Sequence, residues 1–405
     1  MRFLRTSSTQ RLLATLLGVV IAVAGGSAIA VAASSGGPVP KPQKLPNAVH
    51  SALAAPTVPG ISANITFTNH LIAASNIQGS DPLLQGASGR LWLSPSTHQL
   101  RLELQSDNGD AQAVVSGGHF WVYDPSANTV YKGTLPAGNG STHESARRET
   151  MPSVSQIQSE LNKLAQHSNV SGAIPSDVAG HAAYTVQVSP KHDGGLLGSA
   201  QMAWDAAHGV PLRFAVYARG DSTPVLELKA TNISFGSVPS TDFAINPPTG
   251  AKVVTVSTPA NTTQHQTRKS KNKHTEITGP AAVQRHLHFT LVAPATLVGL
   301  PRQSVSLLDW KGTPAALVTY GQNLGGVAVV EQDASKASGL PSGTTSGSGE
   351  DQRGLSLPTV SIGGATGREL DTALGTVLTF TRDKVAYTVL GSVPAAAAEA
   401  AARGL

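Results

Sequence analysis

The stretch "GGHFWVYDPSANTVYKGTLP", residues 117–136, gathers four large aromatic side chains around one turn, although aromatic residues make up only 4% of the chain. The turn begins at Asp124, which is followed by a proline, and Asp-Pro pairs favour turns. An aromatic-rich segment flanks the turn on each side, so the stretch predicts a β-hairpin whose successive side chains alternate between two faces. The four aromatic residues are Phe120, Trp121, Tyr123 and Tyr131.

The same two-residue period recurs in several other segments of residues 61–255. In "LRLELQ", which begins at Leu100, three leucines share one face of a strand, and Arg, Glu and Gln share the other. Strict alternation is typical of antiparallel strands with one dry face and one wet face. The apolar residues that alternate in this way on three strands are Leu100, Leu102, Leu104, Leu212, Phe214, Val216, Leu226 and Leu228.

One amphipathic helix is predicted between these strands. Ser153 can act as its N-cap, and apolar residues follow at helical spacing. These apolar residues are Val154, Ile157, Leu161 and Leu164. Residues 61–255 therefore predict a many-stranded antiparallel sheet with at least one helix over its dry face.

The last part of the chain, residues 281–405, predicts a second and smaller α+β domain. Alternating segments run from "HLHFTLVAP" at residue 286 to "KVAYTVLG" at residue 384, and a short alanine-rich helix spans residues 394–404. The fold class expected for the whole chain is thus α+β.

The first 33 residues indicate the compartment. Arg2, Arg5 and Arg11 precede an apolar run over residues 12–33, which predicts a secretory signal peptide or an uncleaved signal anchor. Small residues near the end of the run match a cleavage site, yet the run exceeds the about 20 residues needed to span a bilayer. In either case the arginines place the rest of the chain outside the cytoplasm, at the cell membrane or, after cleavage, secreted or periplasmic.

Two segments of low complexity predict the domain boundaries, and a third predicts a loop within the last domain. Residues 34–60 are rich in Pro, Ser, Ala and Gly, and we expect a flexible spacer there. Residues 256–280 have the composition of a polar, basic linker, and residues 334–354 that of a long mobile loop.

Composition and motifs argue against several kinds of chemistry. The net charge of +5 is concentrated at the N-terminus and in the linker, so we expect no nucleic-acid partner. The chain has no cysteine, which excludes disulfides and thiolate metal sites, and we expect no cofactor. It has neither a phosphate-binding glycine motif nor a G-x-S-x-G motif, so an enzyme, such as an unrecognised hydrolase, is disfavoured. His286 and His288 would share one face of a strand, where we expect a surface pair and no metal site.

The strand-rich region resembles a known family. The motifs are the "FWVYDPSANTVY" hairpin at residues 120–131 and the "DFAINPPTGA" ending at residues 242–251. They are similar to the LolA-like proteins, which include outer-membrane lipoprotein carriers and the periplasmic sensor that regulates an envelope-stress sigma factor. Residues 283–405 resemble the small C-terminal domain of such sensors.

The resemblance implies a curved antiparallel β half-barrel with covering helices, whose concave apolar face holds acyl chains. Its implied ligand is a lipid or a lipoprotein, and its implied partner is a membrane anti-sigma or signalling protein. On this reading the chain is a membrane-associated carrier or envelope-stress sensor. The alternative is a non-catalytic interaction protein with a plugged cavity, which acts through its C-terminal domain. The expected cavity-lining residues are Leu100, Leu102, Leu104, Trp121, Leu212, Phe214, Val216, Leu226 and Leu228.

The N-terminal segment makes a testable prediction. Alkaline phosphatase fused after residue 60 should be active, because the arginines before residue 12 keep the N-terminus inside and send the fusion outside. The measurement is phosphatase activity in whole cells, with the same fusion lacking residues 1–33 as the control. An inactive full-length fusion would refute the topology.

Overall fold

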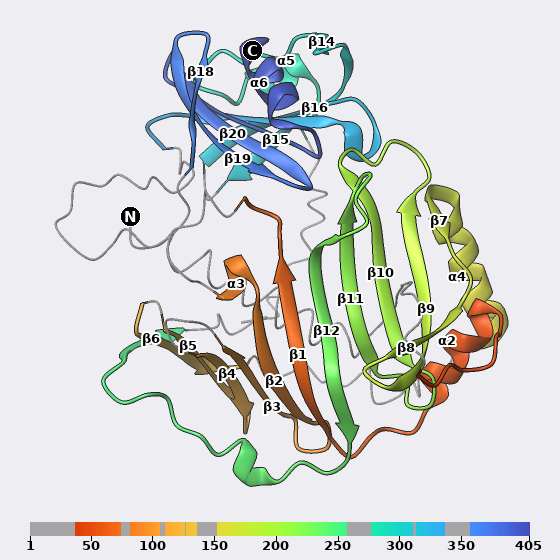
Figure 1. The fold of residues 1–405 in the computed structure, drawn as a ribbon. Coiled ribbons are helices and arrows are strands. Elements are labelled where there is room, and N and C mark those ends of the chain that lie inside the picture. The colour runs from red at the N-terminus through yellow and green to blue at the C-terminus, as the bar shows by residue number, and fades with distance from the viewer. Residues whose placement is uncertain are drawn as a thin grey trace, which may run out of the picture.

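The structure is a computed structural model, and it describes residues 37–73, 82–105, 110–125, 127–135, 152–256, 277–310, 313–336 and 357–405 (Figure 1). The predicted signal or anchor segment at 1–33 lies outside these residues, as do most of the predicted linker and of the predicted mobile loop. None of the described helices combines the length and the apolar composition that a bilayer crossing requires.

The predicted fold class is confirmed. The chain is α+β, with a large sheet curled into a half-barrel and a smaller C-terminal sheet (Figure 1). In the described part of the chain the large sheet has 13 strands in two antiparallel series, β1–β6 and β9–β12, which meet where β1 pairs with β12. Its strands are β1 (Ile61–Asn69), β2 (Ala87–Ser94), β3 (Gln99–Gln105), β4 (Ala111–Ser116), β5 (His119–Asp124), β6 (Thr129–Thr134), β7 (Ser168–Val170), β8 (Ile174–Val178), β9 (His181–Pro190), β10 (Leu197–Asp205), β11 (Pro211–Ala218), β12 (Pro224–Phe235) and β13 (Lys252–Val256).

The predicted aromatic hairpin is the pair β5–β6. It pairs antiparallel, with Phe120 opposite Gly133 and Trp121 opposite Lys132. The side chain of Asp124 accepts the backbone N–H of Ala127 and so stabilises the turn.

The predicted helix is α4 (Val154–His167). Ser153 caps it, since its Oγ accepts the N–H of Gln156 and the Gln156 side chain accepts the N–H of Ser153. Ile157 is buried, and Leu161 packs with a cluster under α2 (Leu45–Ala54). Two shorter helices are α3 (Pro82–Gln85) and η3 (Ser240–Asp242).

The prediction of a flexible spacer at residues 34–60 is wrong for its central part. Residues 45–54 form α2, and Leu45 and Ala48 are buried against Tyr184, Val186 and Trp204. The phenol of Tyr184 also donates a hydrogen bond to the carbonyl oxygen of Lys41, at 2.6 Å. Pro and Ala suggested a spacer because they are common in linkers, but Pro46 lies in the first turn of a helix, where proline is favoured.

One strand departs from the predicted antiparallel pattern. After β12 the chain passes over the wet face, where Arg101 Nη1 donates to the carbonyl oxygen of Asp242 at 2.8 Å and Phe243 is buried. It then adds β13 to the edge of the sheet, parallel to β6. The long return across the sheet is what makes a parallel pairing possible.

The C-terminal sheet has eight strands in the described residues, in the order β14-β15-β16-β17-β21-β20-β19-β18. Its elements are α5 (Pro280–Gln284), β14 (Thr296–Leu297), β15 (Leu300–Trp310), β16 (Thr313–Tyr320), η4 (Asn323–Gly325), β17 (Val327–Asp333), β18 (Thr359–Ile362), β19 (Ala365–Thr372), β20 (Gly375–Arg382), β21 (Val385–Gly391) and α6 (Ala395–Arg403). Helix α6 confirms the predicted alanine-rich helix.

The predicted strand at residues 286–294 is wrong. This segment is irregular in the structure, and His286 follows α5, where its ring Nδ1 lies 3.0 Å from the carbonyl oxygen of Ala282. His286 and His288 therefore do not share a strand face. The segment packs on the sheet through Leu287, Phe289 and Leu291, so its apolar residues are explained by tertiary packing rather than by a strand.

A buried carboxyl group lies in the core of this sheet. Glu331 on β17 is 0% exposed, and its Oε2 accepts the N–H of Val292 at 2.9 Å. Its Oε1 has no hydrogen-bond partner among the described residues. Burial raises the pKa of Glu331 to about 7, and burial together with the neighbouring Glu331 charge raises the pKa of Tyr320 to about 12.

Glu331 therefore predicts a pH dependence of stability. In the unfolded chain a Glu titrates near a pH of about 4.3. Because the folded pKa is higher, the folded state holds more protons between the two values, and the free energy of unfolding falls as the pH rises through them. Glu331→Gln should flatten this dependence, whereas Glu160→Gln, at an exposed site on α4, should leave it unchanged. Denaturant unfolding from pH 4 to 8 measures it; parallel profiles for wild type and Glu331→Gln would contradict the prediction.

Candidate ligand-binding face

Strand register gathers the apolar residues of the large sheet on one face. Phe67 pairs with Leu228, Leu228 with Phe214, and Phe214 with Met202. Directly paired side chains lie on the same side of a sheet. These four residues therefore form one row across β1, β12, β11 and β10, which we call the open row. The whole side that carries them is called the apolar face.

The leucines of β3 lie on the same face. Leu102 pairs with Leu91 on β2, which pairs with Ala63 on β1, and Ala63 alternates in register with Phe67. The face continues through Ala113 and Val122 into the aromatic hairpin. A one-residue shift at any of these pairings would turn that strand's apolar side chains to the wet face.

Exposure divides the expected cavity residues into two groups. Leu100, Leu102, Leu104 and Leu212 are buried, at 3–8% exposed, within one hydrophobic cluster. Phe214 is 38% exposed, and Val216, Leu226 and Leu228 are half-buried. The open part of the apolar face therefore lies on β10–β12 and the end of β1, rather than on β3.

Trp121 is placed differently from the expectation. It pairs with Val114, which pairs with Arg101 on β3, so it lies on the face opposite to Leu102. On that face the guanidinium of Arg101 stacks over Trp92, 4.6 Å from the ring centroid. From the hairpin, Phe120 and Val122 face the apolar side instead. The alternation of the hairpin is visible in the sequence, but which of its faces joins the leucines is not, because that depends on pairing with β4.

Helices cover one end of the apolar face. α2 and α4 pack over β9 and β10, where Leu45 and Ala48 contact the cluster of Tyr184, Val186 and Trp204. Val186 pairs with Met202, so this covered end continues directly into the open row. Burial raises the pKa of the Tyr184 phenol, as expected for a group beneath a helix.

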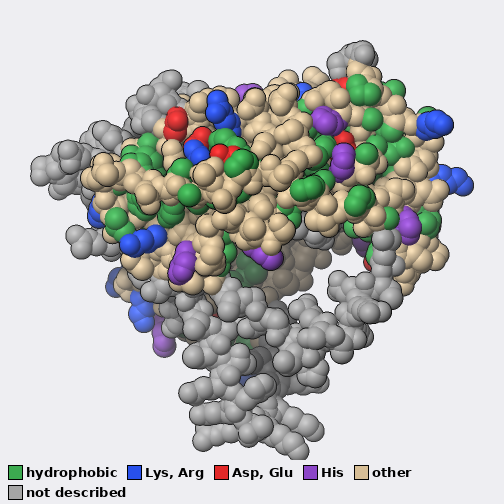
Figure 2. Space-filling model, turned by 90° about the horizontal axis from the view of Figure 1, so that it is seen from below, with side chains coloured by type: hydrophobic (Ala, Val, Ile, Leu, Met, Phe, Trp, Pro, Cys, Tyr) green, Lys and Arg blue, Asp and Glu red, His purple; other side chains and the backbone are tan. Residues whose placement is uncertain are grey.

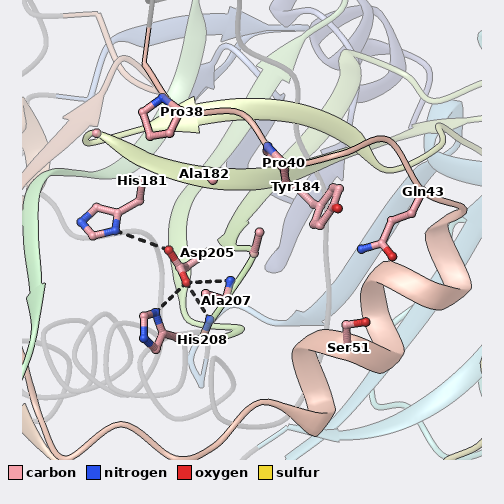
Figure 3. A pocket seen from close by; sticks show the side chains of 12 residues that line it. Pro38, Pro40, Gln43, Ser51, His181, Ala182, Tyr184, Asp205, Ala207 and His208 are labelled. Atoms are coloured by element: carbon pink, nitrogen blue, oxygen red, sulfur yellow. Dashed lines mark hydrogen bonds and ion pairs between the residues drawn. The ribbon is translucent and has the colours of Figure 1, made fainter.

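A hollow of about 500 Å³ lies beside α2, away from the open row, and was not indicated by the sequence (Figure 3). The side chain of Asp205 lies at its centre and accepts hydrogen bonds from the backbone N–H groups of Ala207 and His208, at 3.0 and 2.6 Å. It also accepts the Nδ1–H of His208 at 2.8 Å, and His181 Nδ1 lies 3.5 Å away. These residues lie at the start of β9, at the end of β10 and in the β10–β11 turn, and no local pattern reveals that they meet in space.

This polar cluster has a structural explanation. Phe235, at the end of β12, lies against the rings of both His181 and His208, at centroid distances of 5.2 and 4.3 Å. His181 Nε2 lies 3.1 Å from the carbonyl oxygen of Ile233. The cluster therefore ties β9 and the β10–β11 turn to β12 at one end of the half-barrel. The described residues place no hydroxyl group in hydrogen-bond contact with His208, as a nucleophilic triad would need, and no group of three metal-ligating side chains.

Figure 2 shows the molecule from below. Histidine side chains lie there among hydrophobic and uncharged ones, several lysine and arginine side chains lie toward the edges, and a few acidic side chains lie beside basic ones.

The proteins to which this chain is similar are solved structures of low sequence identity. No protein-family model matches the chain, and no curated protein sequence does. Among solved structures, MucB of Pseudomonas aeruginosa in complex with MucA matches 88% of this chain and 95% of its own, at 14% identity and a TM-score of 0.36.

Two further structures match the strand-rich half. A putative outer membrane lipoprotein-sorting protein domain from Vibrio parahaemolyticus covers 49% of this chain and 95% of its own, at 11% identity and a TM-score of 0.21. A LolA superfamily protein from Nitrosomonas europaea covers 50% and 99%, at 9% identity and a TM-score of 0.19. Likenesses of this size carry no inference about function, which must come from the residues of this chain.

The division of the apolar face predicts two different stability effects. Leu102→Asn should lower the free energy of unfolding by about 2–4 kcal/mol, because it buries an unpaired amide and leaves a void. Phe214→Asn should lower it by less than about 1 kcal/mol, because water can solvate the new amide. Urea unfolding measures both. Equal losses would show that the two positions lie in the same sealed core.

Proposed function

We propose that this chain is a non-enzymatic binding protein of the cell envelope that holds the acyl chains of a lipid or of a lipidated partner against the open row. The observation that carries the proposal is the exposure of Phe214. Its side chain is 38% exposed although it lies in the middle of the apolar face. A large ring left in water at such a place costs free energy, about 25 cal/mol for each Å² of apolar surface. An apolar ligand would remove that cost.

The character of the open row fits acyl chains better than a polar ligand. Its four side chains are Phe67, Met202, Phe214 and Leu228, none of which is charged. Methionine adapts its shape to different apolar contacts. Arg213 and Glu227, two of the charged neighbours of the row along β11 and β12, point to the other face, where they pair with each other at 2.5 Å. Lys229 pairs in register with Arg213 and so lies on that face too.

The envelope location and the partner belong to the same proposal. The apolar run at residues 12–33, after three arginines, supports a chain held on the outer side of the cell membrane, or secreted or periplasmic if that segment is removed. The motifs at residues 120–131 and 242–251, which resemble those of envelope carriers and sensors, support a partner. We propose that the ligand state of this chain regulates a membrane anti-sigma or signalling protein, or that the chain acts as a carrier.

A second candidate function has one observation in its favour. Leu100, Leu102 and Leu104 are already buried, so part of the apolar face is filled by the protein itself. If side chains of the protein also cover the open row in solution, no ligand can bind there. The chain is then an interaction protein with a plugged cavity, which acts through its C-terminal domain.

The two functions are separated by uptake of a fluorescent fatty acid. The acyl-binding function predicts saturable uptake by the wild type and an about tenfold weaker affinity for Phe214→Asn, since the lost contact corresponds to about two methylene groups, about 1.6 kcal/mol. Leu228→Asn should weaken uptake in the same direction. Leu53→Asn, at a 52% exposed site on α2, is the matched control and should bind as the wild type does. A wild type that takes up no probe would favour the plugged cavity.

A further inference from the structure

The C-terminal sheet also has an apolar row on one of its faces. Along β21, Tyr387 and Val389 point into the core that α5 and α6 cover, so Leu390 points to the opposite face. Leu390 pairs with Ala328 on β17 and with Val377 on β20. The residues that register joins in this way, called the second row, are Leu370, Val377, Leu390 and Ala328.

The second row is partly open. Leu390 is 37% exposed, close to the value for Phe214, and the other three side chains are half-buried. The next positions on the same face of β20 and β21 are Thr379 and Thr388, which pair with each other. On these two strands the apolar strip is therefore narrow, one side chain wide, which suits an extended chain better than the broad surface of a folded partner.

The row lies at the end of the C-terminal sheet that touches the large sheet. Figure 1 shows α5 and α6 on the side of the C-terminal sheet away from the large sheet, so the second row is on the side toward it. Ser392, two residues after Leu390, accepts the N–H of Leu196 through both its carbonyl oxygen and its Oγ, each at 3.0 Å. A Cβ atom added to the neighbouring Gly195 would lie 2.1 Å from the Ser392 carbonyl oxygen, so this close approach requires glycine.

A second contact joins the other side of the open row. The N–H of Ala373, in the β19–β20 turn beside Leu370 and Val377, donates to the carbonyl oxygen of Leu71 at 2.9 Å. The segment after β1 is in turn held to β12, because the N–H of His70 donates to Val225 at 2.7 Å. The C-terminal sheet thus contacts the large sheet beside β10 and beside β1, on both sides of the strands that carry the open row.

We propose that acyl chains bound on the open row extend onto the second row, so that the C-terminal sheet supplies one wall of the binding site. This inference rests on the proposed acyl-binding function. A methylene group that stays in water adds nothing to binding, whereas one that is buried on an apolar surface strengthens it. The second row offers such a surface on the sheet that is hydrogen-bonded to the chain beside β1 and β10. The role of the C-terminal region is then direct contact with the ligand.

The test uses the full chain, the fluorescent fatty acid, and a fatty acid with a diazirine at its methyl end. Leu390→Asn should weaken uptake by about three- to tenfold, and Leu53→Asn should leave it unchanged. Because Leu390→Asn could act through folding, photo-crosslinking of the wild type provides the second measurement. Mass spectrometry should then find crosslinks in peptides of β20–β21 as well as in those of β10–β12.

The outcomes separate this inference from the function on which it rests. One outcome is that uptake falls with Phe214→Asn but not with Leu390→Asn, and that crosslinks are confined to the large sheet. This outcome overturns the proposal that the second row contacts the ligand, and it leaves the acyl-binding function supported. A wild type that neither takes up nor crosslinks the probe overturns both.

Discussion

The pairing of β1 with β12 is the interaction on which the rest of the structure depends. It joins residues 61–69 to residues 226–235, so two strand series that are far apart in sequence become one sheet. Its register places Phe67 opposite Leu228 and thereby aligns the dry faces of both series. A register shift between Asn64 and Ile65 keeps the alignment as the strands twist. Without this pairing there would be two small sheets and no continuous apolar face.

That continuity explains why one part of the face is core and another part is open. The β3 leucines lie within a packed cluster, and α2 and α4 cover β9 and β10. Phe214 lies between these covered regions, with the C-terminal sheet held close by Ser392. The proposed site is thus a gap between three packed regions. Such a gap can persist in a stable protein because the packed hydrophobic clusters on each side of it supply the stability.

The sequence predicted the features that depend on local period and on single turns. The aromatic hairpin, the Ser153 cap and the alternation of Leu102 and Leu228 are all visible within a few residues. The sequence could not show that α2 packs on Tyr184, since a proline-rich segment reads as a linker until its contacts are known. Nor could it place Trp121 on the wet face or bring His181 and His208 to one carboxylate. These depend on strand pairing, which composition and spacing do not encode.

The central claim is that the open row holds an acyl chain in the native protein. Mass spectrometry of the lipids that remain with the purified full chain tests it most directly. Comparison with Phe214→Asn corrects for lipid that adheres to the apolar N-terminal segment, which both proteins share. We expect more acyl-bearing molecules per wild-type chain than per variant chain, by at most about one, because the variant binds about tenfold more weakly. Equal lipid content in two equally well folded proteins would contradict it.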